Sequence, residues 1–319
     1  MILARDISLA RFTILGSRTT LSGSASMTGP SPGRAGKTGG GRLFTVARIA
    51  NVEIGCDLEV DDMNFGIEGR RALVTGAGRG IGRAIAESLA REGAKVAVFS
   101  RTASDIQSLV EEMGGTGSGH YGSAFDFEPN GSPAELVADL DANFGPIDIL
   151  VNNLGGTLEI TDPFCSLEDW RRVIRVNLEV AIELNLLLLP NMRGKQWGRI
   201  VNIASTSSVE NNGPITYCTA KAALASYSRS LGRVLAPEGI VMSAVLPGAV
   251  LTEGGYWDKV LKERPEHAET YLKTRCPQGR FGTPDDIAHM VTFLCSDLAS
   301  FCQGAIVPVD GGQVRGYFS

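Results

Sequence analysis

A tyrosine and a lysine lie four positions apart in the segment TYCTAKAALASYSRSL, whose apolar residues recur at helical spacing. On a helix, Tyr217 and Lys221 therefore share one face. A phenol with a pKa of about 10 exchanges protons poorly at neutral pH, but a neighbouring ammonium favours the phenolate and lowers that pKa. The pair could thus act in general acid/base chemistry. On its own, such a pair is more often a solvated feature of a helix surface.

A serine and an asparagine strengthen this interpretation. The run GRIVNIAS, which predicts a strand, ends at Ser205, twelve residues before Tyr217. Ser207 or Ser208 could take its place, but Ser205 directly follows the strand and would be held more rigidly. Asn177 stands inside RRVIRVNLEV, a helical segment in which asparagine is a poor helix former. Its amide could serve chemistry or simply bond back to the helix.

A glycine-rich turn indicates a binding site for phosphate groups. The strand-like run ALVTG continues into TGAGRGIG, a Gly-x-x-x-Gly-x-Gly spacing that opens a helix and differs from the common Gly-x-Gly-x-x-Gly. Glycines permit a tight turn and a close approach of the backbone to a pyrophosphate, which a helix N-terminus attracts. A plain turn between strand and helix is the alternative. The candidate nucleotide-binding residues here are Gly76, Arg79, Gly80, Ile81 and Gly82.

Together these motifs resemble the short-chain dehydrogenase/reductase family, and the resemblance extends over residues 66–312. The third predicted strand ends where that family contacts the adenine, at Asp126 and Phe127. The fourth ends in Asn-Asn-Leu-Gly, where the family usually has Asn-Asn-Ala-Gly; its candidate cofactor contacts are Asn153 and Gly155. Leu154 is a departure that could narrow the adenine and ribose side of the groove. The two asparagines could also simply cap the strand end.

The resemblance implies a role for each residue of the first motifs. Reduction of a ketone needs a hydride from the nicotinamide and a proton for the developing alkoxide. By resemblance, Tyr217 is the acid/base, and Lys221 tunes it and holds the nicotinamide ribose. Ser205 would hydrogen-bond the substrate oxygen, and Asn177 would hold a proton-relay water. Many members of the family have thirteen residues, rather than twelve, between this serine and the tyrosine.

A further stretch, LPGAVLTEG, matches the family's segment that closes over the nicotinamide. The matching residues are Pro247, Gly248 and Thr252. Thr252 is a candidate for contacting the nicotinamide carboxamide or a phosphate. A plain turn at Pro247 and Gly248 is the alternative.

The end of the second strand, in KVAVFSRT, bears on the choice of cofactor. An NAD(H) enzyme of this family would place an acid there to bind the ribose 2'-hydroxyl, whereas this chain has Ser100. Arg101 follows it and Arg79 lies in the glycine turn, so two guanidiniums could flank a 2'-phosphate. We therefore expect NADP(H) rather than NAD(H). Either arginine could instead be a solvated surface residue.

Alternating strands and helices must position these motifs. From Met63 onward, short β-rich runs alternate with helical periods, which predicts βαβ units. We expect a Rossmann-type, doubly wound α/β fold: a single domain with a parallel sheet of about seven strands and helices on both faces. Ligands in such sheets bind beyond the carboxyl ends of the strands, where most of the motifs fall. The predicted strands are 71–75, 95–99, 122–126, 147–152, 198–204, 239–246 and 305–309.

Residues 1–62 differ in composition from the rest. Through residue 50 they hold seven basic residues, a single acid and a stretch rich in Gly, Ser, Thr and Pro. Such a stretch buries too little apolar surface to order itself, so we expect a disordered or weakly ordered extension before a catalytic domain over 63–319. An Arg-rich, acid-poor leader is also typical of an organelle transit peptide. Met63, just before the first core strand, would suit the start of a standalone enzyme, which favours a dispensable extension.

Composition argues against several classes of function. The net charge of −5 gives no global attraction to nucleic acid, and no basic run with interleaved aromatics occurs. The six cysteines form no Cys-x-x-Cys pair and the three histidines are far apart. We therefore expect reduced thiols, a cytoplasmic location and no metal site. No apolar stretch reaches the roughly 18 residues of a membrane span.

The substrate is expected to contact the segment EGGYWDKVLKERPEHAETYLKTRCP, which follows Thr252. Its apolar side chains could form a lid over a small carbonyl or alcohol substrate, or could pack the segment onto the body. A 3-oxoacyl thioester is frequent in the family, but no strong basic patch marks a carrier protein or coenzyme A. Sugar, polyol and steroid-like alcohols therefore stay open. The side chains concerned are Tyr256, Trp257, Val260, Leu261 and Tyr271.

Two other classes of function agree less well with these motifs. A non-catalytic nucleotide-binding or interaction protein can share this fold, but the complete set of Asn177, Ser205, Tyr217 and Lys221 argues against it. A hydrolase would need a nucleophile elbow between strand and helix. The Gly-x-Ser-x-Gly at 29–33 lies in the unpatterned extension, so we attribute it to chance.

Assembly into a homo-oligomer is also expected. Two long helices, predicted near 168–192 and 217–235, carry apolar residues on more than one face, which is more than one sheet face would cover. They are expected to pair across a two-fold axis. The resemblance implies a tetramer or dimer, with the C-terminal GQVRGYFS near a second interface. The apolar residues are Leu178, Ile182, Leu186, Leu187, Ala222, Leu224 and Leu231.

Overall fold

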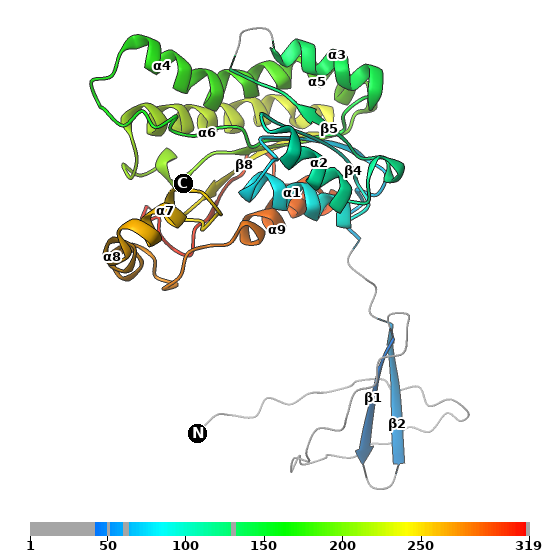
Figure 1. Cartoon of the computed structure of the whole chain (residues 1–319). Helices are drawn as coiled ribbons and strands as arrows, with labels where there is room; N and C mark the ends of the chain where they lie inside the picture. The colour runs from blue at the N-terminus through cyan, green and yellow to red at the C-terminus, as the bar shows by residue number, and fades with distance from the viewer. Residues whose placement is uncertain (1–41, 50–51, 60–63, 129–131, 317–319) are drawn as a thin grey trace. The chain divides into compact units, whose positions relative to one another are not determined.

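The computed structural model describes residues 42–49, 52–59, 64–128 and 132–316, which belong to two compact units. The larger unit holds a seven-stranded sheet in the order β5-β4-β3-β6-β7-β8-β9, and every neighbouring pair is parallel (Figure 1). The strands are β3 (Arg71–Thr75), β4 (Lys95–Ser100), β5 (Tyr121–Ala124), β6 (Ile149–Asn152), β7 (Gly198–Ile203), β8 (Ile240–Pro247) and β9 (Ile306–Val309). The predicted Rossmann-type fold is confirmed.

The central strands are buried on both faces. Every residue of β6, β7 and β8 is buried, and β3 is half-buried only at its first residue. Burial on both sides explains why their sequences are nearly continuous runs of Val, Ile and Leu rather than alternating patterns. In the strand order, β3 and β6 are neighbours and the connections run outward from them in opposite directions. Their carboxyl ends therefore form the crevice in which such sheets bind ligands.

Helices cover both faces of the sheet. On one face, α1 (Gly80–Arg91), α2 (Ala103–Glu112) and α9 (Pro284–Cys295) contribute to one apolar cluster. On the other, α3 (Ser132–Asn143), α5 (Val180–Lys195) and α6 (Ile215–Leu235) contribute to a second. Figure 1 shows α3, α5 and α6 above the sheet and α1 and α9 below it.

The region expected to form one helix over 168–192 is helical throughout, but it contains a π-helical turn. The structure divides this region into α4 (Leu167–Ile174), a π-helical turn (Arg175–Glu179) and α5. Asn177 lies in the turn, and its Nδ2 donates to the carbonyl oxygen of Val173 at 2.8 Å. The side-chain amide thus bonds a carbonyl near the point where the π-helical turn interrupts the regular series of α-helical hydrogen bonds. This explains why an asparagine interrupts an otherwise helical pattern.

Two short helices follow β8 and precede α9. They are α7 (Tyr256–Glu263) and α8 (Pro265–Arg275), and Figure 1 shows them together at one side of the sheet. Val260 of α7 and Ala268 of α8 are each 1% exposed, so the pair is anchored by apolar contacts. We call residues 252–276, which include both helices, the lid segment.

The smaller unit contains an antiparallel hairpin of β1 (Arg42–Ile49) and β2 (Val52–Glu59). The sequence analysis predicted no strand here. Residues 1–41, 50–51 and 60–62 of the expected extension lie outside the described part of the chain. In the described part, no helix is both long enough and apolar enough to cross a membrane.

Candidate active site

A cavity of about 1220 Å³ opens where the carboxyl ends of β3, β4, β6, β7 and β8 meet the lid segment. It is lined by every residue that the sequence analysis proposed for the cofactor and by three of the four proposed catalytic residues, Ser205, Tyr217 and Lys221. Asn177 does not line it. Residues far apart in the sequence are therefore brought to one place.

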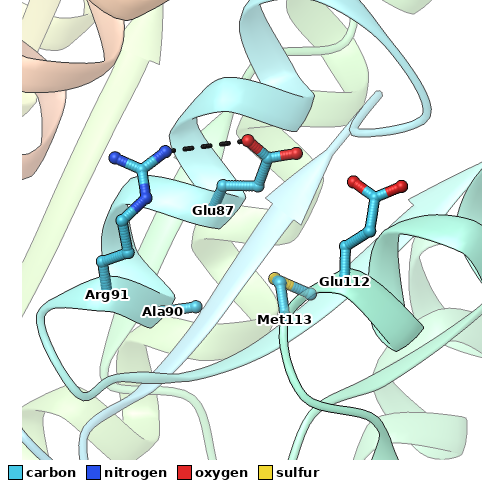
Figure 2. A pocket seen from close by; sticks show the side chains of 5 residues that line it. All are labelled: Glu87, Ala90, Arg91, Glu112 and Met113. Atoms are coloured by element: carbon cyan, nitrogen blue, oxygen red, sulfur yellow. Dashed lines mark ion pairs between the residues drawn. The ribbon is translucent and has the colours of Figure 1, made fainter.

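A second, smaller hollow lies between α1 and α2 near their C-terminal ends (Figure 2). None of its lining residues was proposed as functional. Its charged side chains are already in ion pairs. Arg91 pairs with Glu87 at 3.7 Å, and the nearby Arg83 pairs with Glu87 and Glu112. Because α1 runs away from the carboxyl end of β3, this hollow lies at the opposite edge of the sheet from the cavity.

The glycine turn between β3 and α1 is closely packed. Gly76 and Gly80 have φ values of +64° and +59°, which favour glycine. A Cβ atom on Gly82 would lie 2.4 Å from the Nδ2 atom of Asn153, which itself donates to the carbonyl oxygens of Thr75 and Gly76. The N-cap residue of α1, Arg79, supplies no side-chain hydrogen bond. The Arg79 side chain therefore does not occupy the first backbone N–H groups of α1. A binding site for the phosphates of a dinucleotide needs such N–H groups to be available.

The adenine side departs from expectation at Asp126. β5 ends at Ala124, so Asp126 does not end the strand but lies two residues beyond it. Its side chain is exposed, and Oδ1 accepts a hydrogen bond from the backbone N–H of Glu128 at 3.0 Å. The neighbouring Phe127 is buried, and Leu154 lines the same region of the cavity.

The region expected to bind a 2'-phosphate contains lining residues that were not expected from the sequence, among them Asp105. Arg79 and Arg101 are exposed at the cavity, and the Oγ of Ser100 is buried without a hydrogen-bond partner in the described structure. A Cβ atom on Gly78 would lie 2.6 Å from that oxygen. Asp105 also lines the cavity here. It lies in the first turn of α2, three residues after the N-cap Thr102.

Tyr217 and Ser205 are coupled directly. Burial raises the pKa of Tyr217, and a hydrogen bond with Ser205 acts in the opposite direction. Ser205 follows β7, and its Oγ accepts from the backbone N–H of Ser207 at 3.1 Å. Lys221 is not among the groups that shift the pKa of the phenol, and burial, the largest cause, raises that pKa, so its direction is opposite to the one expected. The phenol therefore remains protonated at neutral pH.

Lys221 lies one helical turn beyond Tyr217. Its Nζ donates to the carbonyl oxygen of Ile203 at 2.8 Å and lies 5.7 Å from the centroid of the Tyr217 ring. The side chain is buried, and this burial lowers its pKa from 10.5 to about 8. The ammonium form therefore predominates at neutral pH but is lost in mildly alkaline solution.

Asn177 does not line the cavity, but its side chain hydrogen-bonds a loop that does. Its Nδ2 donates to the carbonyl oxygen of Gly156 at 2.9 Å, and its Oδ1 accepts from the Gly156 N–H at 3.0 Å. A Cβ atom on Gly155 would lie 2.5 Å from that Oδ1 and 2.8 Å from the Nζ of Lys221. With its bond to Val173, the amide makes three hydrogen bonds. The alternative of back-bonding to the helix is thus observed, and the same side chain fixes the loop beside Lys221.

The segment that follows β8 is held by another missed residue, Gln313. Its Oε1 accepts from the backbone N–H of Ala249 at 3.0 Å, and its Nε2 donates to the Sγ of Cys276. A Cβ atom on Gly248 would lie 2.5 Å from that Oε1. Gly248 is therefore needed for close packing of the C-terminal segment. No sequence spacing marks Gln313, because its partners come from distant parts of the chain.

The apolar residues of the lid segment divide between the two expected roles: some line the cavity and others pack the segment onto the body. Val260 is buried and does not line the cavity, nor does Leu261. Trp257 lines the cavity and stands in an aromatic cluster, with its ring centroid 4.2 Å from that of Tyr271 and 4.8 Å from that of Phe281. Polar residues that the sequence did not mark as candidates also line this side, among them Asn211, Asn212, Glu253, His267 and Arg275.

In the described residues, no group of three or more His, Cys, Asp and Glu side chains is arranged to hold a metal ion. The cysteines among residues 64–316 are Cys165, Cys218, Cys276, Cys295 and Cys302, and all five have free thiols.

Comparison with known proteins agrees with this geometry. The family model described as Enoyl-(Acyl carrier protein) reductase matches residues 76–313. The 3-oxoacyl-[acyl-carrier-protein] reductase FabG of Aquifex aeolicus (strain VF5) is 37% identical over 253 residues, which are 79% of this chain and 100% of that protein.

Two solved structures share the fold over the same region. L-sorbose reductase from Gluconobacter frateurii, complexed with NADPH and L-sorbose, has a TM-score of 0.73 and 28% identity, covering 80% of this chain and 100% of that chain. A 3-oxoacyl (acyl-carrier-protein) reductase from Agrobacterium tumefaciens C58, with NADP bound, has a TM-score of 0.72 and 30% identity at the same coverage. The match of the family model, together with the identity to the curated relative, shows that this chain belongs to the short-chain dehydrogenase/reductase family of NAD(P)-dependent oxidoreductases.

Proposed function

We propose that the protein is an NADP(H)-dependent oxidoreductase that interconverts a carbonyl group and a secondary alcohol in a small molecule. The observation that carries the proposal is the single cavity that joins the glycine turn of α1 to Ser205, Tyr217 and Lys221. A nucleotide at the glycine turn and a carbonyl group at Tyr217 would share this space. A non-catalytic binding protein has no need for a buried acid/base pair at that point.

The proposed roles follow from the contacts. When bound, the dihydronicotinamide supplies the hydride. The buried phenol of Tyr217 is protonated at neutral pH, so it can donate a proton to the developing alkoxide. Ser205, which is hydrogen-bonded to that phenol, would donate to the same oxygen. Lys221 would hold the ribose and stabilise the phenolate that remains after proton transfer. Asn177 would fix the Gly155–Gly156 loop beside Lys221 and, as the family resemblance implies, hold a proton-relay water.

The choice of NADP(H) rests on charge. Arg79 and Arg101 have no ion-pair partner among the described residues and border the cavity beside Ser100. A 2'-phosphate would supply the missing partner. The sorbose reductase and the 3-oxoacyl reductase compared above were solved with NADPH and NADP, respectively, which supports the same assignment.

The remaining assignments are the domain arrangement, the compartment and the assembly. We place the catalytic domain at 63–319 and treat residues 1–62 as a dispensable extension. Five free thiols in the described part of the chain suit a reducing compartment such as the cytoplasm. A homo-oligomer is supported by two exposed leucines on α5, Leu186 and Leu187.

Oxidation of NADPH by the purified protein tests the proposal. With a panel of ketones and 3-oxoacyl and enoyl thioesters, at least one carbonyl compound should be reduced. Tyr217→Phe removes the proton donor and should lower turnover by at least about 100-fold, because general acid catalysis contributes that much. The Kd of NADPH should barely change. Near-normal turnover in Tyr217→Phe would contradict the proposed mechanism, and absence of NADPH binding to the wild-type protein would contradict the cofactor.

A further inference from the structure

The substrate side of the cavity is the part that residues 206–214 and the lid segment line around Tyr217. Several of its polar groups have unused hydrogen-bonding capacity. Asn211 and Glu253 line it, and neither side chain has a hydrogen bond or ion pair with any residue that the structure describes. Arg275 uses one N–H group to bond Glu210 at 2.9 Å, which leaves further donors on the guanidinium. The wall therefore offers guanidinium donors from Arg275, a carboxylate acceptor from Glu253, and the amide of Asn211, which can both donate and accept.

One further amide is held rigidly beside the proposed catalytic serine. Asn212 donates from Nδ2 to the Oγ1 of Thr206 at 3.1 Å, and its Oδ1 accepts from the hydroxyl of Ser207. Because Thr206 and Ser207 directly follow Ser205, the amide is fixed relative to the carbonyl-binding point. Its second Nδ2 hydrogen has no partner among the described residues. A group next to the reacting carbonyl would meet a preoriented donor.

An aromatic cluster lines the same cavity as these polar groups. Trp257 lines the cavity and is supported by Tyr256, Tyr271 and Phe281, with centroid distances of 5.1, 4.2 and 4.8 Å. His267 stacks near it at 6.3 Å with an interplanar angle of 12°. The supported indole can receive the C–H face of a ring while hydroxyl groups at the ring edge reach the polar wall.

The positive charges at the opening are already engaged. Lys259 of the lid segment lies 3.8 Å from the carboxylate of Glu159, and Arg275 is paired with Glu210. Among the described lining residues of the substrate side, Arg275 is the only one with a permanent positive charge. A thioester of coenzyme A or of a carrier protein brings phosphate groups that need cations. Its alkyl chain would also make no hydrogen bond with Asn211 or Glu253, which are exposed at the cavity.

We infer that the substrate is a polyhydroxylated carbonyl compound of the sugar type, an inference that rests on the proposed reduction of a carbonyl group at Tyr217. Hydroxyl groups both donate and accept, so they match a wall that presents Asn211, Asn212, Glu253 and Arg275 together. The indole of Trp257 covers the less polar face of the substrate. Discrimination against an unhydroxylated ketone comes from the polar groups that such a ketone leaves unpaired.

A matched pair of ketones tests the inference. Inosose, a pentahydroxycyclohexanone, and cyclohexanone share the same ring and a free carbonyl group, and acetoacetyl coenzyme A represents the thioesters. With saturating NADPH, kcat/KM for inosose is expected to exceed that for cyclohexanone and for acetoacetyl coenzyme A by at least about 10-fold, since loss of paired polar contacts is costly to specificity. Equal or higher kcat/KM for cyclohexanone or the thioester overturns the inference.

Substitutions on the wall localise the effect. Asn211→Leu preserves size at an exposed position without internal hydrogen bonds, so it leaves the fold unaffected. It is expected to lower kcat/KM for inosose by about 10-fold and to reduce the preference for inosose over cyclohexanone, while the Kd of NADPH stays constant. Gln107→Leu is the control, because Gln107 is exposed on α2 and bonds only Glu111. An Asn211→Leu enzyme with unchanged discrimination contradicts the assigned wall.

Binding separates this inference from the proposed reaction. Saturation-transfer NMR on the NADPH complex reports inosose and cyclohexanone binding whether or not either is reduced. Preferential binding of inosose without turnover supports the hydroxyl-binding wall and counts against the proposed reaction. Turnover with preferential binding of cyclohexanone supports the reaction and overturns the inference.

Discussion

At the scale of single residues, Lys221 links cofactor binding to pH. Its buried ammonium has a pKa of about 8, below the value of 10.5 for a free lysine, because burial disfavours charge. The folded pKa is the lower one, so the ammonium form is present below about pH 8 and is lost as the pH rises through that value. If this ammonium holds the nicotinamide ribose, NADPH affinity must fall over the same interval.

We therefore expect the Kd of NADPH to rise by roughly 10-fold between pH 7 and pH 9.5, which corresponds to about 1.4 kcal/mol of charge-assisted bonding. Fluorescence titration of the free enzyme at constant ionic strength measures it. Lys221→Met should bind NADPH more weakly at pH 7 and show little change with pH. A wild-type Kd that stays constant over this interval would exclude the ammonium as a ribose ligand.

Cofactor selectivity is a second property of individual residues. If Arg79 and Arg101 each contribute about 1 to 2 kcal/mol to 2'-phosphate binding, NADPH should be preferred over NADH by about 10-fold to 1,000-fold in kcat/KM. Ser100→Asp with Arg101→Ala should reverse this preference, because the new carboxylate repels the phosphate and can bind ribose hydroxyls. Arg91→Ala, an exposed arginine outside the cavity, is the control. A double variant that still prefers NADPH would sink the assignment.

The sequence identifies these residues better than it predicts their ionisation. Tyr217, Ser205 and Lys221 could be found because two short motifs place them on a helix face and at a strand end. The direction of the Tyr217 pKa could not be found, because it depends on how completely neighbouring elements bury the phenol. Asp105 was missed because its proximity to the cavity depends on how α2 packs against the glycine turn.

At the scale of elements, the C-terminal segment after β9 must pack tightly against the end of β8. A Cβ atom on Gly248 would lie 2.5 Å from Gln313 Oε1 and 2.7 Å from the Cα of Asp310. Gly248→Ala should therefore destabilise the protein by about 1 to 3 kcal/mol, the usual cost of overpacking. The melting temperature should fall by several degrees.

Gly117→Ala is the matched control, because a Cβ atom there has no neighbour within 4 Å. Its stability should change by no more than about 0.5 kcal/mol. Differential scanning calorimetry measures both variants. Equal melting temperatures for Gly248→Ala and the wild type would show that Gln313 moves without cost and does not fix this segment.

The boundaries of regular elements were largely predictable. Each predicted strand agrees with the observed one to within two residues at either end, because buried parallel strands are compact apolar runs bounded by turn residues. The π-helical turn between α4 and α5 could not be predicted, because the extra residue of such a turn leaves no clear mark on the spacing of apolar residues. Asn177 was the only local sign of it, and that sign became interpretable once Gly156 was found opposite its amide.

At the scale of the whole molecule, α5 presents apolar side chains that the described chain leaves uncovered. Leu186 and Leu187 are 62% and 40% exposed, whereas Leu224 of α6, which the sequence analysis grouped with them, is 1% exposed and belongs to the core. Adjacent exposed leucines on a helix outside the lid segment favour pairing with a second copy across a two-fold axis. We therefore expect an oligomer at micromolar concentration.

Leu186→Glu with Leu187→Glu should weaken this assembly by at least about 100-fold, since burial of two carboxylates in an apolar contact costs more than about 2.7 kcal/mol. Light scattering coupled to size-exclusion chromatography measures the mass of each protein over a dilution series. Leu298→Glu, at an exposed leucine after α9, is the control and should leave the mass unchanged if α5 forms the contact. A monomeric wild-type protein at micromolar concentration would contradict the expected oligomer. An oligomer that withstands the double substitution on α5 but dissociates with Leu298→Glu would place the contact near Leu298 instead.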